Sequence, residues 1–481
     1  MCELFSTVER SISEDTMMAM KGIILQRNNN VHNNADNKNS ILQLDPRKCN
    51  LEILLVVDEA LSNLKFTELH LLDLLIDESL AASLGELIQS RHWDRIYIKA
   101  CNGRVDLLLQ HAIHRTQTLT CIRCNQRHKF EDYCTAYMQS LGKELMACSS
   151  LKRLQLDVHF DALPKVTAVG LGLSSCKSLQ ELVLDNSTFV KRDVFGTFLA
   201  DLPSLHITSL SLQDCGLSDS HLASLVRTLQ HKKIPLKCLN ISFNYCKAEG
   251  SLALAEYLAC PNCSLECLQI QHQARLDVNA IAHSLIPNRS LKYLYLSENE
   301  WTDHPYLELA RQLQHPEVSV SHVYIKSTRE YEDDDFYVFI DNEDYKDASL
   351  DGAMLVVWKE FCKALQVNDS LVTLELDTKW IQTKRTLIPA TPSSASIAMI
   401  ELLQAMVTFA TFNRCHLQTA IRHQDRSQRE LWPSIISTSV RAWYTNWSHD
   451  PYTQQALQGS NIHMEASMIF HVLRNGPWMY S

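Results

Sequence analysis

The feature that most constrains the fold of this chain is a short phrase, Leu-x-x-Leu-x-Leu, which returns at intervals close to 28 residues. It is plainest in the six residues from Leu151 to Leu156 and in those from Leu291 to Leu296. Copies start at residues 66, 93, 119, 151, 179, 207, 236, 265, 291, 320 and 371. A fixed period of this size is typical of an array in which one structural unit is stacked on the next.

The spacing of the copies is regular with one exception. Successive starts are 27, 26, 32, 28, 28, 29, 29, 26, 29 and 51 residues apart. The last step, 51 less one repeat of 28, predicts an insertion of about 23 residues before the final copy.

Each copy of the phrase predicts a short strand. Because side chains alternate between the faces of a strand, the fourth and sixth residues point into the core, and the first joins them at the bend. The third, fifth and seventh residues then point outward. An Asn or Cys at the ninth position can hydrogen-bond the neighbouring turn, and four copies have one: Cys101, Cys215, Asn244 and Asn299. The other copies deviate, so we expect this row of hydrogen bonds to be imperfect.

The remainder of each repeat predicts a helix. Apolar residues recur at helical spacing between Asp219 and Leu229, and Ser218 or Asp219 is a good N-cap. A strand and a helix within about 28 residues resemble the ribonuclease-inhibitor type of leucine-rich repeat, most closely at 207–217. The resemblance covers roughly 64–380. It implies an α/β horseshoe-shaped solenoid with a parallel concave sheet and outer helices. The competing interpretation is an ordinary α/β domain with leucine-rich strands.

Three regions follow from these patterns. We expect 1–45, which ends in an Asn-rich stretch, to be disordered, with the apolar residues 51–61 capping the first repeat. The leucine-rich-repeat domain takes 46–380, with about 11 repeats and an acidic insertion at 329–347. The tail, 381–481, holds four of the eight tryptophans in its last 50 residues and predicts a helical cap. An aromatic groove for a partner is the alternative for this tail.

Charge and composition exclude several classes of protein. Residues 330–347 carry a net charge of −8 out of −10 for the chain, so the rest is nearly neutral and lacks the basic stripe of nucleic-acid-binding proteins. No stretch reaches the roughly 18 apolar residues that a membrane span needs. The sixteen cysteines fall largely at core and strand positions, and the first ten residues lack a signal peptide. We therefore predict a cytoplasmic, monomeric protein with reduced thiols.

The outward positions predict a surface that changes along the array. Early copies present basic residues, the next two present acidic ones, and the four copies from 207 to 297 present no charge at their twelve outward positions. Tyrosines follow, and tyrosine is common at binding surfaces. The candidate partner-binding residues are Arg95, Tyr97, Lys99, Arg123, Arg153, Asp185, Gln269, Tyr293, Tyr295 and Tyr324. The acidic insertion is either a docking flap for a basic partner or a solvated loop.

Catalytic and cofactor signatures are missing from the sequence. There is no Walker A motif, no Gly-x-Ser-x-Gly and no His-Glu-x-x-His, and the two glycines of Gly170-Leu-Gly172 fall in a helical part of their repeat. Two cysteine clusters, around 121–134 and 260–272, have spacings that zinc sites use. Ordinary thiols are the competing explanation, and we predict no metal and no cofactor.

A non-enzymatic interaction scaffold is the function these patterns favour. It would bind a protein partner through its concave face and rim. The alternatives are a regulator of an enzyme, either a GTPase activator or an inhibitor, and a ubiquitin-ligase substrate adaptor.

Overall fold

The computed structural model describes most of the repeat region. The described residues are 23–27, 40–44, 67–122, 131–157, 163–187, 189, 192–201, 206–273, 276–297, 303–325, 349–368 and 370–375. They divide into two compact units. Unit 1 comprises Met1–Leu217 and His231–Ile241, and unit 2 comprises Ser218–Gln230 and Ser242–Ser481.

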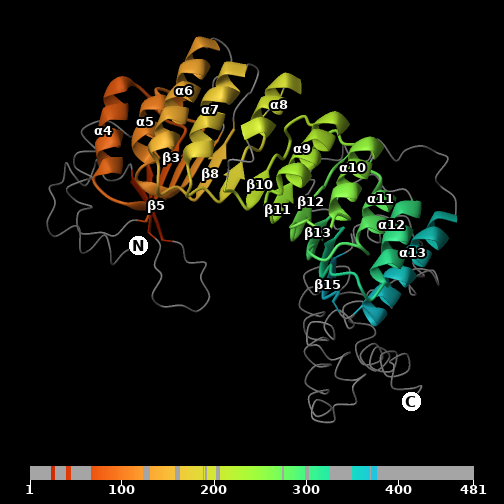
Figure 1. Cartoon of the computed structure of the whole chain (residues 1–481). Coiled ribbons are helices and arrows are strands. Elements are labelled where there is room, and N and C mark those ends of the chain that lie inside the picture. Colours follow the sequence, from red (N-terminus) through yellow and green to blue (C-terminus); the bar gives the residue numbers. More distant parts are fainter. Residues whose placement is uncertain are drawn as a thin grey trace, which may run out of the picture. The chain divides into compact units, whose positions relative to one another are not determined.

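Unit 1 is a sheet whose strands follow one another in chain order, with helices along one face (Figure 1). Its strands are β1 (Ile23–Arg27), β2 (Ser40–Leu44), β3 (Glu68–Leu72), β5 (Trp93–Lys99), β7 (Thr116–Ile122), β8 (Arg153–Leu156), β9 (Glu181–Val183), β10 (Ser209–Ser211) and β11 (Cys238–Asn240). All neighbouring pairs are parallel except β1 and β2, which form an antiparallel pair. A second, two-stranded sheet joins β4 (Leu75–Ile76) to β6 (Asn102–Gly103).

The helices of unit 1 each follow a strand and cover the same face. They are α4 (Glu78–Gln89), α5 (Val105–Ala112), α6 (Glu131–Ala147), α7 (Leu163–Ser175) and α8 (Arg192–Asp201). Local sequence explains where they start; for α4, the Asp77 carboxylate accepts a hydrogen bond from the backbone N–H of Leu80 at 2.7 Å.

Unit 2 repeats the same architecture. Its strands, all parallel, are β12 (Cys267–Gln269), β13 (Tyr293–Tyr295), β14 (His322–Tyr324) and β15 (Thr373–Glu375). Its helices are α9 (Asp219–Lys232, whose last two residues belong to unit 1), α10 (Ala248–Leu258), α11 (Val278–Ser284), α12 (Asp303–Leu313) and α13 (Ser349–Val367). The helix α13 lies between β14 and β15. The 51-residue spacing between the last two copies of the phrase is therefore a single repeat, with its insertion before the helix. The fold is therefore an open leucine-rich-repeat solenoid.

On the strand side, the core of the described repeats is formed mainly by the first, fourth and sixth residues of each repeat, as the sequence predicts. In the repeat at 207 these are Ile207, Leu210 and Leu212, and none is more than 1% exposed. Strand pairing places equivalent residues side by side, since Leu210 pairs with Leu182 on one side and Leu239 on the other. Burying one such side chain contributes about 1.5–3 kcal/mol. The stacked rows of leucine supply the main driving force for folding.

The predicted register is wrong in one repeat. Leu119 is a fourth-position residue, because it pairs with Ile96 of β5 and Leu154 of β8. The repeat that contains β7 therefore starts at Thr116, three residues earlier than predicted. A threonine is tolerated at this fully buried position because its hydroxyl donates to the backbone carbonyl oxygens of Asp94 and Thr118. The prediction was wrong because Leu119, Ile122 and Cys124 have the same spacing as the three core residues of the phrase.

Hydrogen bonds at the ninth position are more regular than the sequence predicts. Cys101 and Cys215 donate from Sγ to the carbonyl oxygens of Leu71 and Leu184 in the preceding repeat, at 3.4 and 3.0 Å. Ser187 does the same toward Leu156 at 3.3 Å. Asn244 and Gln273 are also buried at this position. Serine and glutamine thus replace the expected Asn or Cys, because their side chains also hydrogen-bond backbone groups.

The eighth position forms a left-handed turn that the sequence did not reveal. Positive φ angles between 51° and 60° recur there, at Asp73, Ala100, Asn186, Asp214, Phe243 and His272. None of these residues is glycine, although this conformation costs an L-residue roughly 1–2 kcal/mol. The closely packed turns on either side hold the chain in this conformation.

Several predicted segments differ from the structure or lie outside it. The stretch 1–45, expected to be disordered, contains the strands β1 and β2, and β2 extends the sheet by pairing with β3. The proposed cap at 51–61, the acidic insertion 329–347 and the tail 381–481 lie outside the described residues, and their boundaries stay predictions. None of the described helices is long and apolar enough to cross a bilayer.

Candidate interaction surface

The candidate surface is the side of each sheet that faces away from the helices, here called the strand face. It is formed by the third, fifth and seventh residues of the repeats. Of the ten predicted partner-binding residues, five belong to the described strand face of unit 1 and four to that of unit 2. Arg123 lies outside the described residues, and in the corrected register it is an eighth-position residue.

The first part of the strand face of unit 1 is a paired cluster. Arg95 of β5 forms an ion pair with Glu68 of β3 at 3.7 Å, because these residues are register partners. Glu68 is also 3.3 Å from the imidazole of His70, whose ring lies 5.3 Å from that of Tyr97. Lys99 follows at the end of β5 and is half-buried. The positive charge of Arg95 is therefore balanced locally, which the sequence did not reveal because the first repeat is weakly marked.

The second part of this face is a polar network that crosses β8 to β11. Arg153 and Glu181 are register partners and form an ion pair. Asp185 accepts hydrogen bonds from the Ser211 hydroxyl and from the backbone N–H of Gln213. Asn240 donates to Ser211 Oγ and Gln213 Oε1, at 3.0 and 3.2 Å. The sequence predicted basic outward residues followed by acidic ones. In the structure, basic and acidic residues of this region pair across neighbouring strands.

Asp185 is the residue of this network whose charge costs most. Burial raises the pKa of the Asp185 carboxyl, although the hydrogen bonds from Ser211 and Gln213 and the Arg153 charge lower it. A raised folded-state pKa means that ionisation opposes folding, so this cost is present above the folded pKa and disappears as the pH falls through it.

Replacing Asp185 with asparagine should therefore stabilise the protein at neutral pH. The amide oxygen can accept the same two hydrogen bonds without carrying a buried charge. We expect a higher thermal midpoint for Asp185→Asn than for wild type at pH 7, with a difference that shrinks toward pH 4. Differential scanning calorimetry across this range measures it, and a gap that widens on acidification would contradict the assignment.

The strand face of unit 2 carries a group of four rings, here called the aromatic block: Tyr293, Tyr295, His322 and Tyr324. Tyr293 stacks on His322 with ring centroids 4.5 Å apart, and Tyr295 stacks on Tyr324 at 4.4 Å with planes 6° apart. Parallel pairing causes this, since each stacked pair is also a register pair on β13 and β14. Strands about 4.8 Å apart place equivalent rings at stacking distance.

The phenol group of Tyr295 is neutral at physiological pH. Burial, reinforced by the neighbouring Tyr324, raises the pKa of Tyr295 to about 12. The fourth predicted residue of this face, Gln269, lies on β12 as the register partner of Tyr295, and its amide donates to Cys267 Sγ at 3.9 Å. One further stack, Phe243 on His272 at 4.8 Å, occupies the eighth-position turns and was not predicted.

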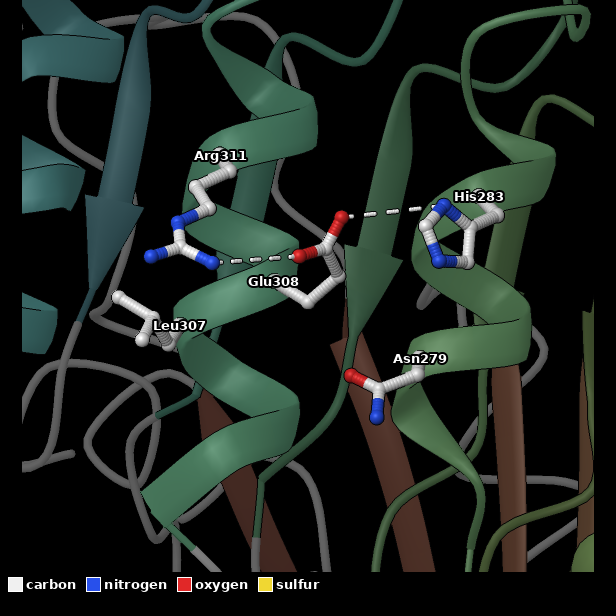
Figure 2. Close-up of a pocket in the computed structure, with 5 residues that line it drawn as sticks. All are labelled: Asn279, His283, Leu307, Glu308 and Arg311. Atoms are coloured by element: carbon white, nitrogen blue, oxygen red, sulfur yellow. Dashed lines mark ion pairs between the residues drawn. The ribbon is translucent and has the colours of Figure 1, made fainter.

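A shallow groove of about 300 Å³ lies on the helix side of unit 2, between α11 and α12. Figure 2 shows Glu308 of α12 between Arg311 of the same helix and His283 of α11. The ion pairs are long, 3.7 Å to Arg311 and 3.8 Å to His283, and both partners of Glu308 are more than half exposed. Pairs of this kind contribute little free energy. The groove is less distinctive than the aromatic block.

The cysteine clusters do not assemble a metal site among the described residues. Cys121 is a buried sixth-position core residue, which corrects the prediction that it points outward. Cys260, Cys263 and Cys267 are reduced and half-exposed. Burial raises the pKa of Cys101 to about 11 and that of Cys246 to about 12, so these core thiols are poor metal ligands at neutral pH.

Comparison with known proteins identifies the repeat type. No family model matches the chain. Mouse ribonuclease inhibitor is 26% identical over 174 residues, which is 34% of this chain and 38% of that protein. Pig ribonuclease inhibitor is 29% identical over 161 residues, 31% of this chain and 35% of that protein. This chain is a leucine-rich-repeat protein whose repeats are similar to those of ribonuclease inhibitors.

Two further proteins are similar to this chain. The cattle NACHT, LRR and PYD domains-containing protein 9 is 26% identical over 166 residues, 32% of this chain and 17% of that protein. The leucine-rich-repeat chain thus aligns with 17–38% of the length of these three relatives. A crystal structure of an internalin from Listeria monocytogenes aligns with 69% of this chain and with 83% of the internalin chain. The two are 12% identical, and the TM-score is 0.30.

Proposed function

We propose that this chain is a non-enzymatic protein-interaction module, cytoplasmic and monomeric, that binds a protein partner through its strand face. The observation that carries the proposal is the aromatic block of unit 2. The two relatives named ribonuclease inhibitor make a binding role the natural expectation for this chain. The residues that bind are a feature of this chain and are argued from its own surface.

The aromatic block has the properties of a binding hot spot. Tyrosine supplies large contact area at low entropic cost and keeps a polar tip. The stacked pairs are already ordered, so little freedom is lost when a partner binds. Tyr293 is 37% exposed, which is high for a large apolar side chain in a packed repeat. The strand face of unit 1 is different, because Arg95 and Arg153 already pair with Glu68 and Glu181.

A comparison of baits tests the proposal. We expect Tyr295→Ala combined with Tyr324→Ala to reduce partner recovery from native lysate at least tenfold, the scale of a hot-spot loss. Tyr245→Ala is the matched control, since Tyr245 is 66% exposed in the same unit but lies outside the strand face, in an isolated bridge with Ser218. Quantitative mass spectrometry of the captured proteins gives the ratio.

Two outcomes would contradict this assignment. Equal recovery by the double variant and the Tyr245 control would remove the aromatic block from the binding site. Loss of the partner with Arg153→Glu, but not with the tyrosine variant, would move the site to unit 1.

Inhibition of an enzyme is the second candidate, favoured by the two relatives named ribonuclease inhibitor. The same capture experiment distinguishes it. A captured enzyme whose turnover falls as this chain is added, and recovers with the tyrosine variant, supports inhibition. Unchanged turnover leaves the chain a scaffold.

A further inference from the structure

The aromatic block is open toward β12. Tyr293 is the register partner of Cys267, so a short side chain stands where the next ring of the stack would be. The face of Tyr293 on that side is not covered by a long side chain at the third position of β12. Stacked rings on β13 and β14 therefore end in a ledge above Cys267, bordered by the amide of Gln269.

The polar groups at the ledge favour a donor with positive charge. Gln269 uses its amide N–H toward Cys267, which leaves its carbonyl oxygen as an acceptor. A tyrosine ring presents a negative π-face, which attracts cations and planar guanidinium groups most effectively. At the third and fifth positions of β12 to β14, which the structure describes, no residue carries a formal charge at neutral pH when His322 is neutral.

Neighbouring charge does not oppose this preference. Lys292, beside the block, is held by Glu266 at 3.0 Å.

We propose that the ledge binds an arginine side chain of the protein partner, with its guanidinium stacked on Tyr293 above Cys267 and donating to the Gln269 carbonyl. The inference rests on the proposed function, since it names the chemistry recognised at the same surface. Lysine fits less well, because its compact ammonium group cannot extend a stack of planar groups.

Cys267 makes the ledge directly testable. Its reduced, half-exposed thiol can exchange with small disulfides, a reaction in which the protein thiolate displaces one probe thiol and no net oxidant is consumed. The full chain is equilibrated, with excess 2-mercaptoethanol, against mixed disulfides of 2-mercaptoethylguanidine, cysteamine, 3-mercaptopropionate and propanethiol. Peptide mass spectrometry then measures each conjugate at Cys267, with Cys260 as the reference thiol outside the strand face.

The expected result is a guanidinium preference at Cys267. Relative to Cys260, the guanidine conjugate should exceed the ammonium conjugate about threefold, the scale of a surface cation–π contact, and the carboxylate by more. Tyr293→Ala should abolish this preference, Gln269→Ala should weaken it, and Tyr245→Ala should leave it unchanged. Tyr293→Leu, which retains apolar bulk, separates stacking from simple burial.

Equal capture of the four probes at Cys267, or a guanidinium preference that survives Tyr293→Ala and Tyr293→Leu, would overturn the proposal. Its failure is distinguishable from failure of the proposed function. A tyrosine variant that loses the partner while the probes show no preference would remove arginine recognition alone. Unchanged partner capture by the Tyr295 and Tyr324 variant would instead remove the binding site itself.

Discussion

Alanine at Gly142 or Gly172 should destabilise unit 1 by about 2 kcal/mol or more, although alanine is normally the better helix former. The two glycines lie where α6 and α7 approach most closely. A Cβ on Gly142 would stand 2.7 Å from the carbonyl carbon of Ala168, and one on Gly172 would stand 2.7 Å from the Cα of Gly142. These obstacles are backbone atoms, so relief requires the helices to separate along their length and to lose packed contacts.

Gly196 of α8 provides the matched control. No atom lies within 4 Å of the position that its Cβ would take. Gly196→Ala should therefore stabilise the protein by about 0.5–1 kcal/mol through helix propensity alone. Urea denaturation of the three variants, followed by circular dichroism, measures the difference. If Gly172→Ala and Gly196→Ala shift the midpoint in the same direction, the close approach of α6 and α7 is wrong.

Asn288→Ala should cost about 2–4 kcal/mol of unfolding free energy. Asn288 is only 2% exposed and precedes the strand β13. Its amide donates to the carbonyl oxygen of Leu258 at 2.7 Å, and its own oxygen accepts from the backbone N–H groups of Ser290 and Leu291. Of the three backbone groups that lose their partner, those of Leu258 and Leu291 are buried, and each unsatisfied buried group costs roughly 1–3 kcal/mol.

The chain contains a control at the equivalent position of another repeat. Asn262, like Asn288, stands three residues before the first core leucine of its repeat, but it is exposed. Asn262→Ala should change stability by less than about 0.5 kcal/mol. Thermal and chemical denaturation of both variants compares them. A loss at Asn262 as large as that at Asn288 would show that the bonds of Asn288 contribute nothing specific.

The position occupied by Asn288 is a recurring device that periodicity did not reveal. Asn368 stands three residues before Leu371, where its amide donates to Leu313 and its oxygen accepts from the N–H of Ser370. Cys148 stands three residues before Leu151 and donates to the carbonyl oxygen of Ile113. Each side chain, amide or thiol, donates to a carbonyl at the C-terminal end of the preceding repeat's helix, so residue identity varies while geometry repeats.

The sequence correctly predicted which side chains point outward, but it did not reveal how their charges pair. Tyr293, Tyr295 and Tyr324 were assigned to one outward face, and the structure places them there on β13 and β14. Arg95 and Arg153 were assigned as a basic patch, but Glu68 and Glu181 pair with them across neighbouring strands. A one-dimensional pattern shows which side chains leave the core; it does not show which of them meet.

The sequence by itself determined the repeat, its strand-and-helix content, and the leucines that fill the core. These depend on local periodicity. Side chains alternate between the two faces of a strand, and the spacing of about 28 residues places the apolar face of every strand on the same side of the sheet, where it is buried. Tertiary structure decided the start of the third repeat at Thr116, the left-handed turns at non-glycine residues, and the stacking of tyrosine on tyrosine. Each of these depends on contacts between residues one repeat apart. The free energy of such contacts cannot be inferred from the local sequence of one repeat.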